Sequence, residues 1–281
     1  MRPAWIGVAI VAVPAALLAV ALLSPDRIYR PPEETVTVPA DAASIARGQH
    51  LVEAVAVCTV CHGDDLGGKL AFDDPILGHG YTANLTAGRG GIGERYGVRD
   101  WVRSIRYGVR PNGTAIQFMP SDHYNTISDT DLGAIIGYLT RLPRIDNERT
   151  RVELNPVARL LIGLGLFGEV NRTARIDFAL PRKELFRDKG AYLTGMAGCT
   201  FCHGSQLKGG QGPEPGAPTA PDLTGTDALR PVAKADFVRS LRLGIARDGH
   251  MIQSKYMPWP GYRNMSDSEL TAIWQYTRRN N

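Results

Sequence analysis

Two pentapeptides set the expectations for this chain: Cys58-Thr59-Val60-Cys61-His62 and Cys199-Thr200-Phe201-Cys202-His203. Both follow the pattern C-x-x-C-H, and together they contain all 4 cysteines of the 281-residue sequence. The pattern places two thiols on one turn, within reach of the two vinyl groups of one porphyrin, and presents the next imidazole to the iron from the same side. The sequence therefore predicts two covalently bound haem c groups, with His62 and His203 as proximal iron ligands.

Three other uses of a C-x-x-C pair fit this sequence less well. A thioredoxin-like redox pair belongs in a βαβ context, and no such alternation occurs here. A four-thiolate zinc site would have to unite two pairs that lie 141 residues apart (199 − 58), and it would leave the histidine after each pair unexplained. A disulfide within each pair would be strained. The haem interpretation accounts for all five positions of both motifs.

The composition is that of a folded protein with room for two domains. Hydrophobic residues make up 43% and charged residues 21% of the sequence. The net charge of +4 is too small to indicate nucleic-acid binding. Residues 41–146 carry 10 basic and 12 acidic side chains, whereas residues 183–281 carry 13 and 9. This asymmetry could steer charged partners, although ordinary surface scatter explains it equally well.

The N-terminus predicts export from the cytoplasm. After Arg2, residues 4–23 form an uncharged stretch of 20 residues, which as a helix would span roughly 30 Å, enough to cross a bilayer. We expect a retained transmembrane helix, although Ala19-Val20-Ala21 also fits a signal-peptide cleavage site. Residues 1–23 are thus an anchor or a signal peptide, and residues 24–40 a linker. The rest would face the periplasm from the bacterial cytoplasmic membrane, or be soluble in the periplasm after cleavage.

An internal repeat divides the exported part. Unit one covers residues 41–146 and unit two residues 183–281, and a bridge over residues 147–182 joins them. The matching segments are Trp101-Val102-Arg103-Ser104-Ile105-Arg106 with Phe237-Val238-Arg239-Ser240-Leu241-Arg242, Gly108 and Gly113 with Gly244 and Gly249, Met119-Pro120 with Met257-Pro258, and Ser128-Asp129-Thr130-Asp131-Leu132 with Ser266-Asp267-Ser268-Glu269-Leu270. The sequence therefore predicts two domains of one kind in tandem.

Each unit is predicted to be helical with long loops, which gives an all-α fold class. Asp41 can cap a helix over residues 42–54, and the segments 98–107 and 234–243 have apolar residues at helical spacing. Ser266-x-x-Glu269 is a capping box that opens the last helix, and Ser128-x-x-Asp131 is its weaker counterpart. We expect no strand of useful length.

In this order of features, each unit resembles a class I cytochrome c domain. The pair resembles the diheme cytochromes, and especially the cytochrome subunits attached to membrane-bound dehydrogenases. The resemblance implies a distal thioether ligand at Met119 for the haem of His62 and at Met257 for the haem of His203. It also implies that a backbone carbonyl accepts from each proximal imidazole, at Pro221 in unit two and at Ala83, in place of proline, in unit one.

Other candidates for the sixth iron ligand are weaker. His79 and His123 have no counterpart in unit two, and Met251 lacks the proline that follows Met119 and Met257. Met196 and Met265 fit a packing role.

Two features leave alternatives open. The repeated pairs Arg103/Arg106 and Arg239/Arg242 suit haem propionates, but equally a solvated helix face. The bridge contains the apolar run 160–167, which is too short to span a membrane. We favour a linker packed between the domains over a segment that dips into the bilayer beside the anchor.

The favoured function is electron transfer, with no catalytic residue in this chain. A membrane-anchored diheme cytochrome would pass electrons from a respiratory or dehydrogenase donor to an acceptor, as a carrier or as a complex subunit, and we expect redox proteins rather than nucleic acid or a small-molecule substrate as partners. The alternative is a haem enzyme, such as a diheme peroxidase or a thiosulfate-oxidising cytochrome. That alternative requires an open or unusual site at one iron, whereas both units carry the same Met-Pro signal and no spare cysteine.

Overall fold

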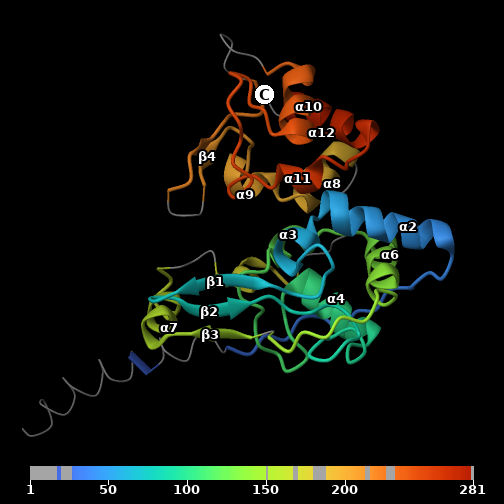
Figure 1. Cartoon of the computed structure of the whole chain (residues 1–281), viewed down its shortest axis with the longest axis vertical. Helices are drawn as coiled ribbons and strands as arrows, with labels where there is room; N and C mark the ends of the chain where they lie inside the picture. Colours follow the sequence, from blue (N-terminus) through green and yellow to red (C-terminus); the bar gives the residue numbers. More distant parts are fainter. Residues whose placement is uncertain are drawn as a thin grey trace, which may run out of the picture.

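Figure 1 shows the computed structural model of the chain, in which unit two lies above unit one. The structure describes residues 18–19, 27–149, 151–166, 170–179, 188–212, 216–225 and 232–279. Most of the predicted membrane segment over residues 1–23 lies outside these residues. Across the described ranges, no helix combines the length and the apolar character needed to cross a bilayer.

Unit one opens with a capped helix, as predicted. The Asp41 carboxylate accepts from the Ser44 N–H at 2.9 Å, and α2 (Ala42–His50) runs directly into a π-helical turn, η2 (Leu51–Val55). The other elements of unit one are α3 (Cys58–His62), β1 (Leu70–Asp74), β2 (Gly78–Tyr81), α4 (Val98–Tyr107), α5 (Ser121–Tyr124) and α6 (Asp129–Leu139). The Ser128 hydroxyl caps α6 by accepting from the Asp131 N–H at 3.1 Å.

Unit two repeats this order. Its elements are α8 (Lys189–Met196), α9 (Cys199–His203), β4 (Gly210–Gln211), β5 (Thr219–Ala220), α10 (Lys234–Leu243), α11 (Trp259–Tyr262) and α12 (Asp267–Arg279). The helices predicted over residues 98–107 and 234–243 have these bounds as α4 and α10. The predicted capping box is also present, because the Ser266 N–H donates to the Glu269 carboxylate at 2.9 Å and the Glu269 N–H to the Ser266 hydroxyl at 3.3 Å.

A glycine in the first helix of each unit sets how closely the first and last helices cross. A Cβ on Gly48 in α2 would lie 2.0 Å from the Ala134 carbonyl oxygen in α6, and one on Gly190 in α8 would lie 2.2 Å from the Ala272 oxygen in α12. Only glycine allows backbones to approach this closely. The helix crossing therefore explains why a glycine occurs ten residues before the first motif and nine before the second (58 − 48, 199 − 190).

The prediction that no useful strand would form was wrong for unit one. Strands β1, β2 and β3 (Val152–Leu154) form an antiparallel three-stranded sheet in that order, and β3 belongs to the bridge. Phe72 of β1 lies across Gly80 of β2, where a Cβ would be 2.1 Å from the ring. Short, glycine-rich strands carry little local signal, and this sheet depends on a partner strand some 70 residues further along the chain.

The rest of the bridge folds against unit one. It continues through α7 (Pro156–Gly163) and the 3-10 turn η3 (Arg172–Arg175). Within the predicted apolar run, Ile162 is buried, whereas Leu164 and Leu166 are exposed. The bridge is therefore structured, and its relation to a bilayer stays a prediction.

The two units pack through reciprocal contacts. In unit one, His50 of α2 contacts Glu269 at the start of α12 with its Nε2 2.8 Å from the carboxylate. In unit two, Tyr192 of α8 donates from its hydroxyl to the Asp131 carboxylate at the start of α6, at 2.7 Å. His50 and Tyr192 both lie two residues after the crossing glycine, and Asp131 and Glu269 occupy matching cap positions. The interface therefore has approximate two-fold symmetry.

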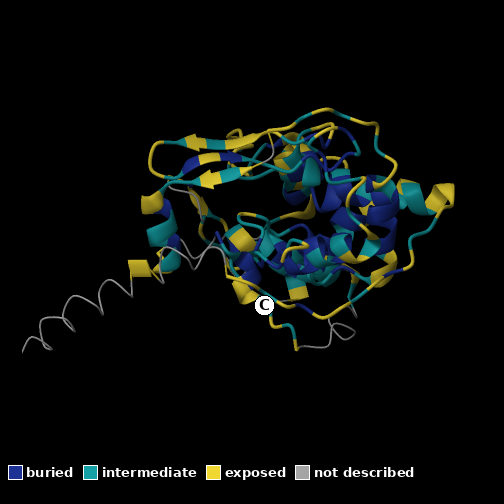
Figure 2. Ribbon diagram, turned by 90° about the horizontal axis from the view of Figure 1, so that it is seen from below, coloured by how far each residue is buried: buried dark blue, intermediate teal, exposed yellow. Residues whose placement is uncertain are grey.

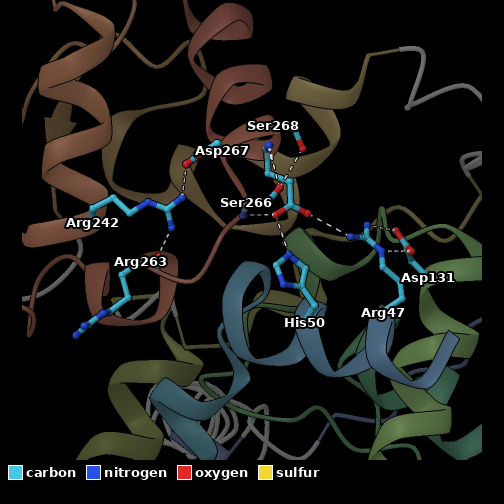
Figure 3. Close-up of polar contacts among 9 residues, drawn as sticks. Arg47, His50, Asp131, Arg242, Arg263, Ser266, Asp267 and Ser268 are labelled. Atoms are coloured by element: carbon cyan, nitrogen blue, oxygen red, sulfur yellow. Dashed lines mark hydrogen bonds and ion pairs between the residues drawn. The ribbon is translucent and has the colours of Figure 1, made fainter. Parts of the chain in front are cut away.

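Arg47 links the two halves of this symmetric contact. Its Nε lies 3.1 Å from the Asp131 carboxylate and its Nη1 3.2 Å from that of Glu269 (Figure 3). Both carboxylates are largely removed from solvent, so each needs a charged partner. Beneath this polar contact, one apolar cluster contains buried side chains of both units, including Leu51, Leu193 and Leu270. Figure 2 shows the buried residues gathered among the helices and the exposed ones on the outer loops and strands.

Candidate haem-binding sites

The two motifs form matching short helices. In α3 and α9 the cysteines lie three residues apart, so both thiols of each pair project from one turn, and the histidine follows at the end of the helix. The residue before each helix has a left-handed backbone, with φ 46° at Val57 and φ 69° at Gly198. A β-branched residue such as Val57 rarely adopts this conformation. The geometry of the motif, rather than the preference of the residue, therefore sets this turn.

The four cysteines are free thiols in the structure, and the rival metal site is not supported. No disulfide joins them. Burial raises the pKa of the Cys58 thiol and of the Cys199 thiol to about 12 in each case. Among the described residues, which include all four cysteines, no group of three or more His, Cys, Asp and Glu side chains could hold a metal ion.

Each motif histidine is held by one backbone carbonyl. The Nδ1 of His62 lies 2.8 Å from the Ala83 oxygen, and the Nδ1 of His203 lies 2.8 Å from the Pro221 oxygen. These are the two carbonyls that the resemblance to class I cytochrome c domains implied. An Nδ1–H bonded in this way leaves Nε2 as the free lone pair for iron. Desolvation lowers the pKa of both imidazoles, which keeps them neutral and able to ligate.

The predicted distal residues gather around the same core. Met119 and Met257 are partly buried and pack against the apolar cluster that also receives Cys58, Cys199 and Ala83. Each methionine is followed by proline and a short helix, α5 or α11. The structure therefore brings cysteines and methionines of both units to one core. The four-ligand assignment itself stays a prediction.

The weaker candidates for the sixth ligand have other environments. The exposed His79 lies with its Nδ1 2.8 Å from the Asp73 carboxylate, and His123 has its Nε2 3.0 Å from a guanidinium nitrogen of Arg172. Met251 is 62% exposed. The remaining two methionines, Met196 and Met265, are buried in the core.

A repeated tyrosine, missed in the sequence, connects each distal loop to its haem motif. The Tyr124 hydroxyl at the end of α5 donates to the Ala56 carbonyl at 2.8 Å, and the Tyr262 hydroxyl at the end of α11 donates to the Ala197 carbonyl at 2.5 Å. Each acceptor lies two residues before the first cysteine of a motif. Both tyrosines are buried. The signal was available, because Tyr124 and Tyr262 occupy matching places five residues after Met119 and Met257.

The residues present fit a porphyrin with polar edges. Trp101 is 2% exposed, and its indole N–H donates to no acceptor in the described part of the chain. A buried donor without a partner is costly, and a haem propionate would supply the acceptor. Trp101 belongs to the same apolar cluster as the motif and distal residues.

The four arginines predicted near the haems are engaged in ion pairs. Arg103 contacts Glu33 at 2.6 Å, and the buried Arg106 contacts Glu34 at 3.0 Å and Asp129 at 2.6 Å. In unit two, Arg239 pairs with Asp236 at 2.9 Å and Arg242 with Asp267 at 2.6 Å (Figure 3). The structure thus shows a role for these side chains in holding helices and linkers. Their contact with haem stays a prediction.

Besides the two tyrosines, the sequence-based prediction also missed a buried arginine of the bridge. Arg172 of the bridge is 3% exposed in its side chain and contacts the Asp122 carboxylate with Nε at 2.5 Å and Nη2 at 2.7 Å. Its guanidinium carbon lies 4.2 Å from the centre of the Phe201 ring, inside the second haem motif. Arg172 therefore joins the distal helix of unit one to the motif helix of unit two. A lone arginine in a linker gives no sequence signal for such a position.

Comparisons with known proteins agree with this geometry. Residues 43–139 match the family described as cytochrome c oxidase, cbb3-type, subunit III, and residues 187–280 match the family cytochrome c. The chain is 28% identical to the fructose dehydrogenase cytochrome subunit of Gluconobacter japonicus over 67% of this chain and 40% of that protein.

Two further relatives are cytochrome subunits. The chain is 34% identical to the alcohol dehydrogenase (quinone) cytochrome c subunit of Gluconobacter oxydans (strain 621H), over 58% of this chain and 36% of that protein. It is 35% identical to the gluconate 2-dehydrogenase cytochrome c subunit of Pantoea cypripedii, over 35% of this chain and 23% of that protein. The chain thus spans less than half the length of the curated relatives it matches.

Both units match cytochrome c models, and each holds a C-x-x-C-H helix with its histidine bonded to the expected carbonyl. The similarity also extends across the bridge, because the alignment with one of these relatives covers 198 residues, more than either unit alone. The chain therefore belongs to the diheme cytochrome c family and carries two covalently bound haem c groups.

Proposed function

We propose that this protein is the electron-transferring cytochrome of a dehydrogenase or quinol-oxidising system, either as a subunit of the complex or as a carrier beside it. Bound haem supplies an iron that cycles between the ferric and ferrous states. The protein holds each proximal imidazole in one tautomer, keeps water from the core and fixes the distance between the two sites. The relatives named as dehydrogenase cytochrome subunits support this assignment.

The observation that carries the proposal is the equivalence of the two units. Each has a histidine bonded through Nδ1 to a carbonyl and a methionine loop held to its motif by a tyrosine hydroxyl. An electron carrier works best when both ligands stay in place in both oxidation states, and a haem enzyme needs one position to be open. Two sites of the same construction, each with a methionine loop held beside its motif, favour the carrier.

Absorption spectroscopy tests this function directly. We expect two low-spin haems in the oxidised protein, with the weak near-infrared band of methionine-to-iron ligation, and no peroxide turnover above that of free haem. A high-spin haem in the resting protein, or rapid peroxide consumption, would favour the enzyme alternative instead.

We further propose that the protein is held at the bacterial cytoplasmic membrane and faces the periplasm. The uncharged residues 4–23 support a retained anchor, and c-type haem is attached outside that membrane. Fractionation of cells followed by N-terminal sequencing checks this. We expect the haem protein in the membrane fraction with residues 1–23 still present. A soluble periplasmic form that starts after Ala21 would show cleavage, and a cytoplasmic haem protein would contradict export.

A further inference from the structure

The loop before each distal methionine has the same construction in both units. Residues 109–118 of unit one and 245–256 of unit two are each closed by an isolated bridge, Val109 with Ala115 and Ile245 with Met251. The two bridges are related by a constant offset of 136 residues (245 − 109, 251 − 115). The loops can therefore be compared position by position.

In unit one, this loop is covered by other parts of the chain. The Tyr29 N–H donates to the Gly113 carbonyl at 2.8 Å, and the Phe118 N–H donates to the Val170 carbonyl of the bridge at 2.8 Å. The ring of Phe72, from the sheet, lies 5.0 Å from that of Phe118. Within this loop Ala115 is 1% exposed, while Pro111, Asn112 and Phe118 keep exposed side chains. Figure 1 shows the chain that follows residue 27 (dark blue) running along unit one.

In unit two, the matching loop is open. Met251, the counterpart of Ala115, is 62% exposed, and a Cβ on Gly249 would meet nothing within 4 Å. Outside the loop itself, its backbone bonds in the described part of the chain reach Gly244 and the side chains of Arg239, Ser240 and Trp259, all in unit two. The linker and the bridge thus shield one distal loop and leave the other to solvent.

The exposed residues form an apolar centre with a cationic edge. We call the unit-two loop surface the set of Leu243 and residues 247–255. Its large exposed apolar side chains are Leu243, 55% exposed, and Met251. Arg247 and Lys255 are exposed cations at its edge, whereas its one carboxylate, Asp248, lies 2.5 Å from the His250 ring. A flexible methionine within a charged rim is typical of a surface that docks proteins.

We propose that the unit-two loop surface docks a separate redox protein whose own apolar patch is rimmed by carboxylates. Electrons exchanged with that protein would pass through the haem of His203, since the surface ends two residues before Met257, while the covered haem of His62 exchanges electrons within the molecule. This inference rests on the proposed electron-transfer function. The excess of 13 basic over 9 acidic residues in unit two agrees with an acidic partner.

Reduction by an acidic electron carrier tests the surface. Fully reduced flavodoxin serves as the probe in stopped-flow mixing with the full-length oxidised protein, and each encounter moves one electron from the flavin to one ferric iron. Lys255→Glu, Arg247→Glu and Met251→Asp should each slow the second-order rate at low ionic strength by about fivefold or more. For the two charge reversals the difference should largely vanish at about 0.5 M salt. Met251→Leu should react as the natural protein does.

The matched control is Arg99→Glu, which makes the same charge change at an exposed position of α4 in unit one. We expect it to keep the natural rate within about twofold. If Arg99→Glu slows the reaction as much as Lys255→Glu, or if none of the unit-two variants slows it, the docking proposal is wrong. Reduction by dithionite is measured on each variant and should be unchanged. Failure of the natural protein to accept electrons even from dithionite would instead refute the electron-transfer function.

Discussion

Met257 and Met119 are the residues on which the redox potentials of the two units should depend most directly. Replacing Met257 by His exchanges a thioether, which favours ferrous iron, for a second imidazole. We expect one of the two midpoint potentials to fall by roughly 100 mV or more, with the other nearly unchanged. Met265→Leu, at a buried packing position in the same unit, serves as the control and should move neither. Two unchanged potentials in a spectroelectrochemical titration of Met257→His would show that the distal ligand lies elsewhere.

Tyr262 should stabilise both the fold of unit two and its distal loop. Tyr262→Phe keeps the ring and removes the hydroxyl that donates to Ala197, which leaves a buried carbonyl without this donor. We expect the free energy of unfolding to fall by about 1–2 kcal/mol, and the near-infrared methionine band of one haem to weaken. Tyr256→Phe, beside Met257 and only half-buried, is the control. Denaturant titration and near-infrared absorption provide the two readouts, and a stable variant with an unaltered band would exclude this role.

At this scale the sequence was informative wherever chemistry constrains spacing. The cysteines and the histidines could be located because covalent haem attachment allows few arrangements, and the carbonyls of Ala83 and Pro221 because of the resemblance to class I cytochrome c domains. Arg172 could not, because its position between Asp122 and Phe201 depends on how the bridge folds back over both units. Tyr124 and Tyr262 occupy matching positions in the repeat, which would have identified them as a pair, but the sequence does not show what their hydroxyls bond to.

The crossing of α8 and α12 has no room for an added methyl group. A Cβ at Gly190 would lie 2.2 Å from the Ala272 oxygen, so Gly190→Ala must push the two helices apart. We expect a loss of about 1–3 kcal/mol in the free energy of unfolding, as for other overpacked contacts. In the same helix, a Cβ at Gly195 would meet its nearest atom at 3.7 Å, so Gly195→Ala should be neutral or stabilising by up to about 1 kcal/mol. Equal losses in both variants, by thermal or denaturant unfolding, would contradict the crossing argument.

Helices were predictable as elements, whereas the sheet was not. Helices α4, α10 and α12 are indicated by apolar spacing and by capping residues that lie within a few positions of one another. Strand β2 contains Gly78 and Gly80 and pairs with β1 on one side and with β3 from the bridge on the other. A pairing between distant segments leaves no periodic pattern in either one. The all-α prediction therefore holds for the helical core of the two units, and it misses the sheet that β1 and β2 of unit one form with β3 of the bridge.

For the whole molecule, Glu269 makes the packing of the two units depend on pH. Although burial alone would raise its pKa, hydrogen bonds from Ser266 and the neighbouring His50 hold the pKa below its usual 4.5. A lowered pKa in the folded state stabilises the protein above pH 4.5, and this stabilisation disappears as the pH falls through the lowered value.

We expect Glu269→Gln to be about 2 kcal/mol less stable than the natural protein at pH 7, with the difference shrinking to near zero by about pH 3. Denaturant titrations across this range measure it. Glu94→Gln, which removes an exposed ion pair with Arg144, should change stability by less than about 0.5 kcal/mol at any pH. A Glu269→Gln deficit that stays constant down to pH 3 would argue that the carboxylate charge is not what matters.

The reciprocal contacts of His50 with Glu269 and of Tyr192 with Asp131 are those of a homodimer, yet both halves belong to one polypeptide. Linking two partners by a short tether gives them an effective concentration in the millimolar range. An interface with a dissociation constant of about 10 μM would then be closed in about 99% of molecules, however dilute the protein. The spacing of the two irons is thus independent of how much protein the cell makes. The outer surfaces of the two units can also differ, with one distal loop covered and the other open, without loss of the contact between the units.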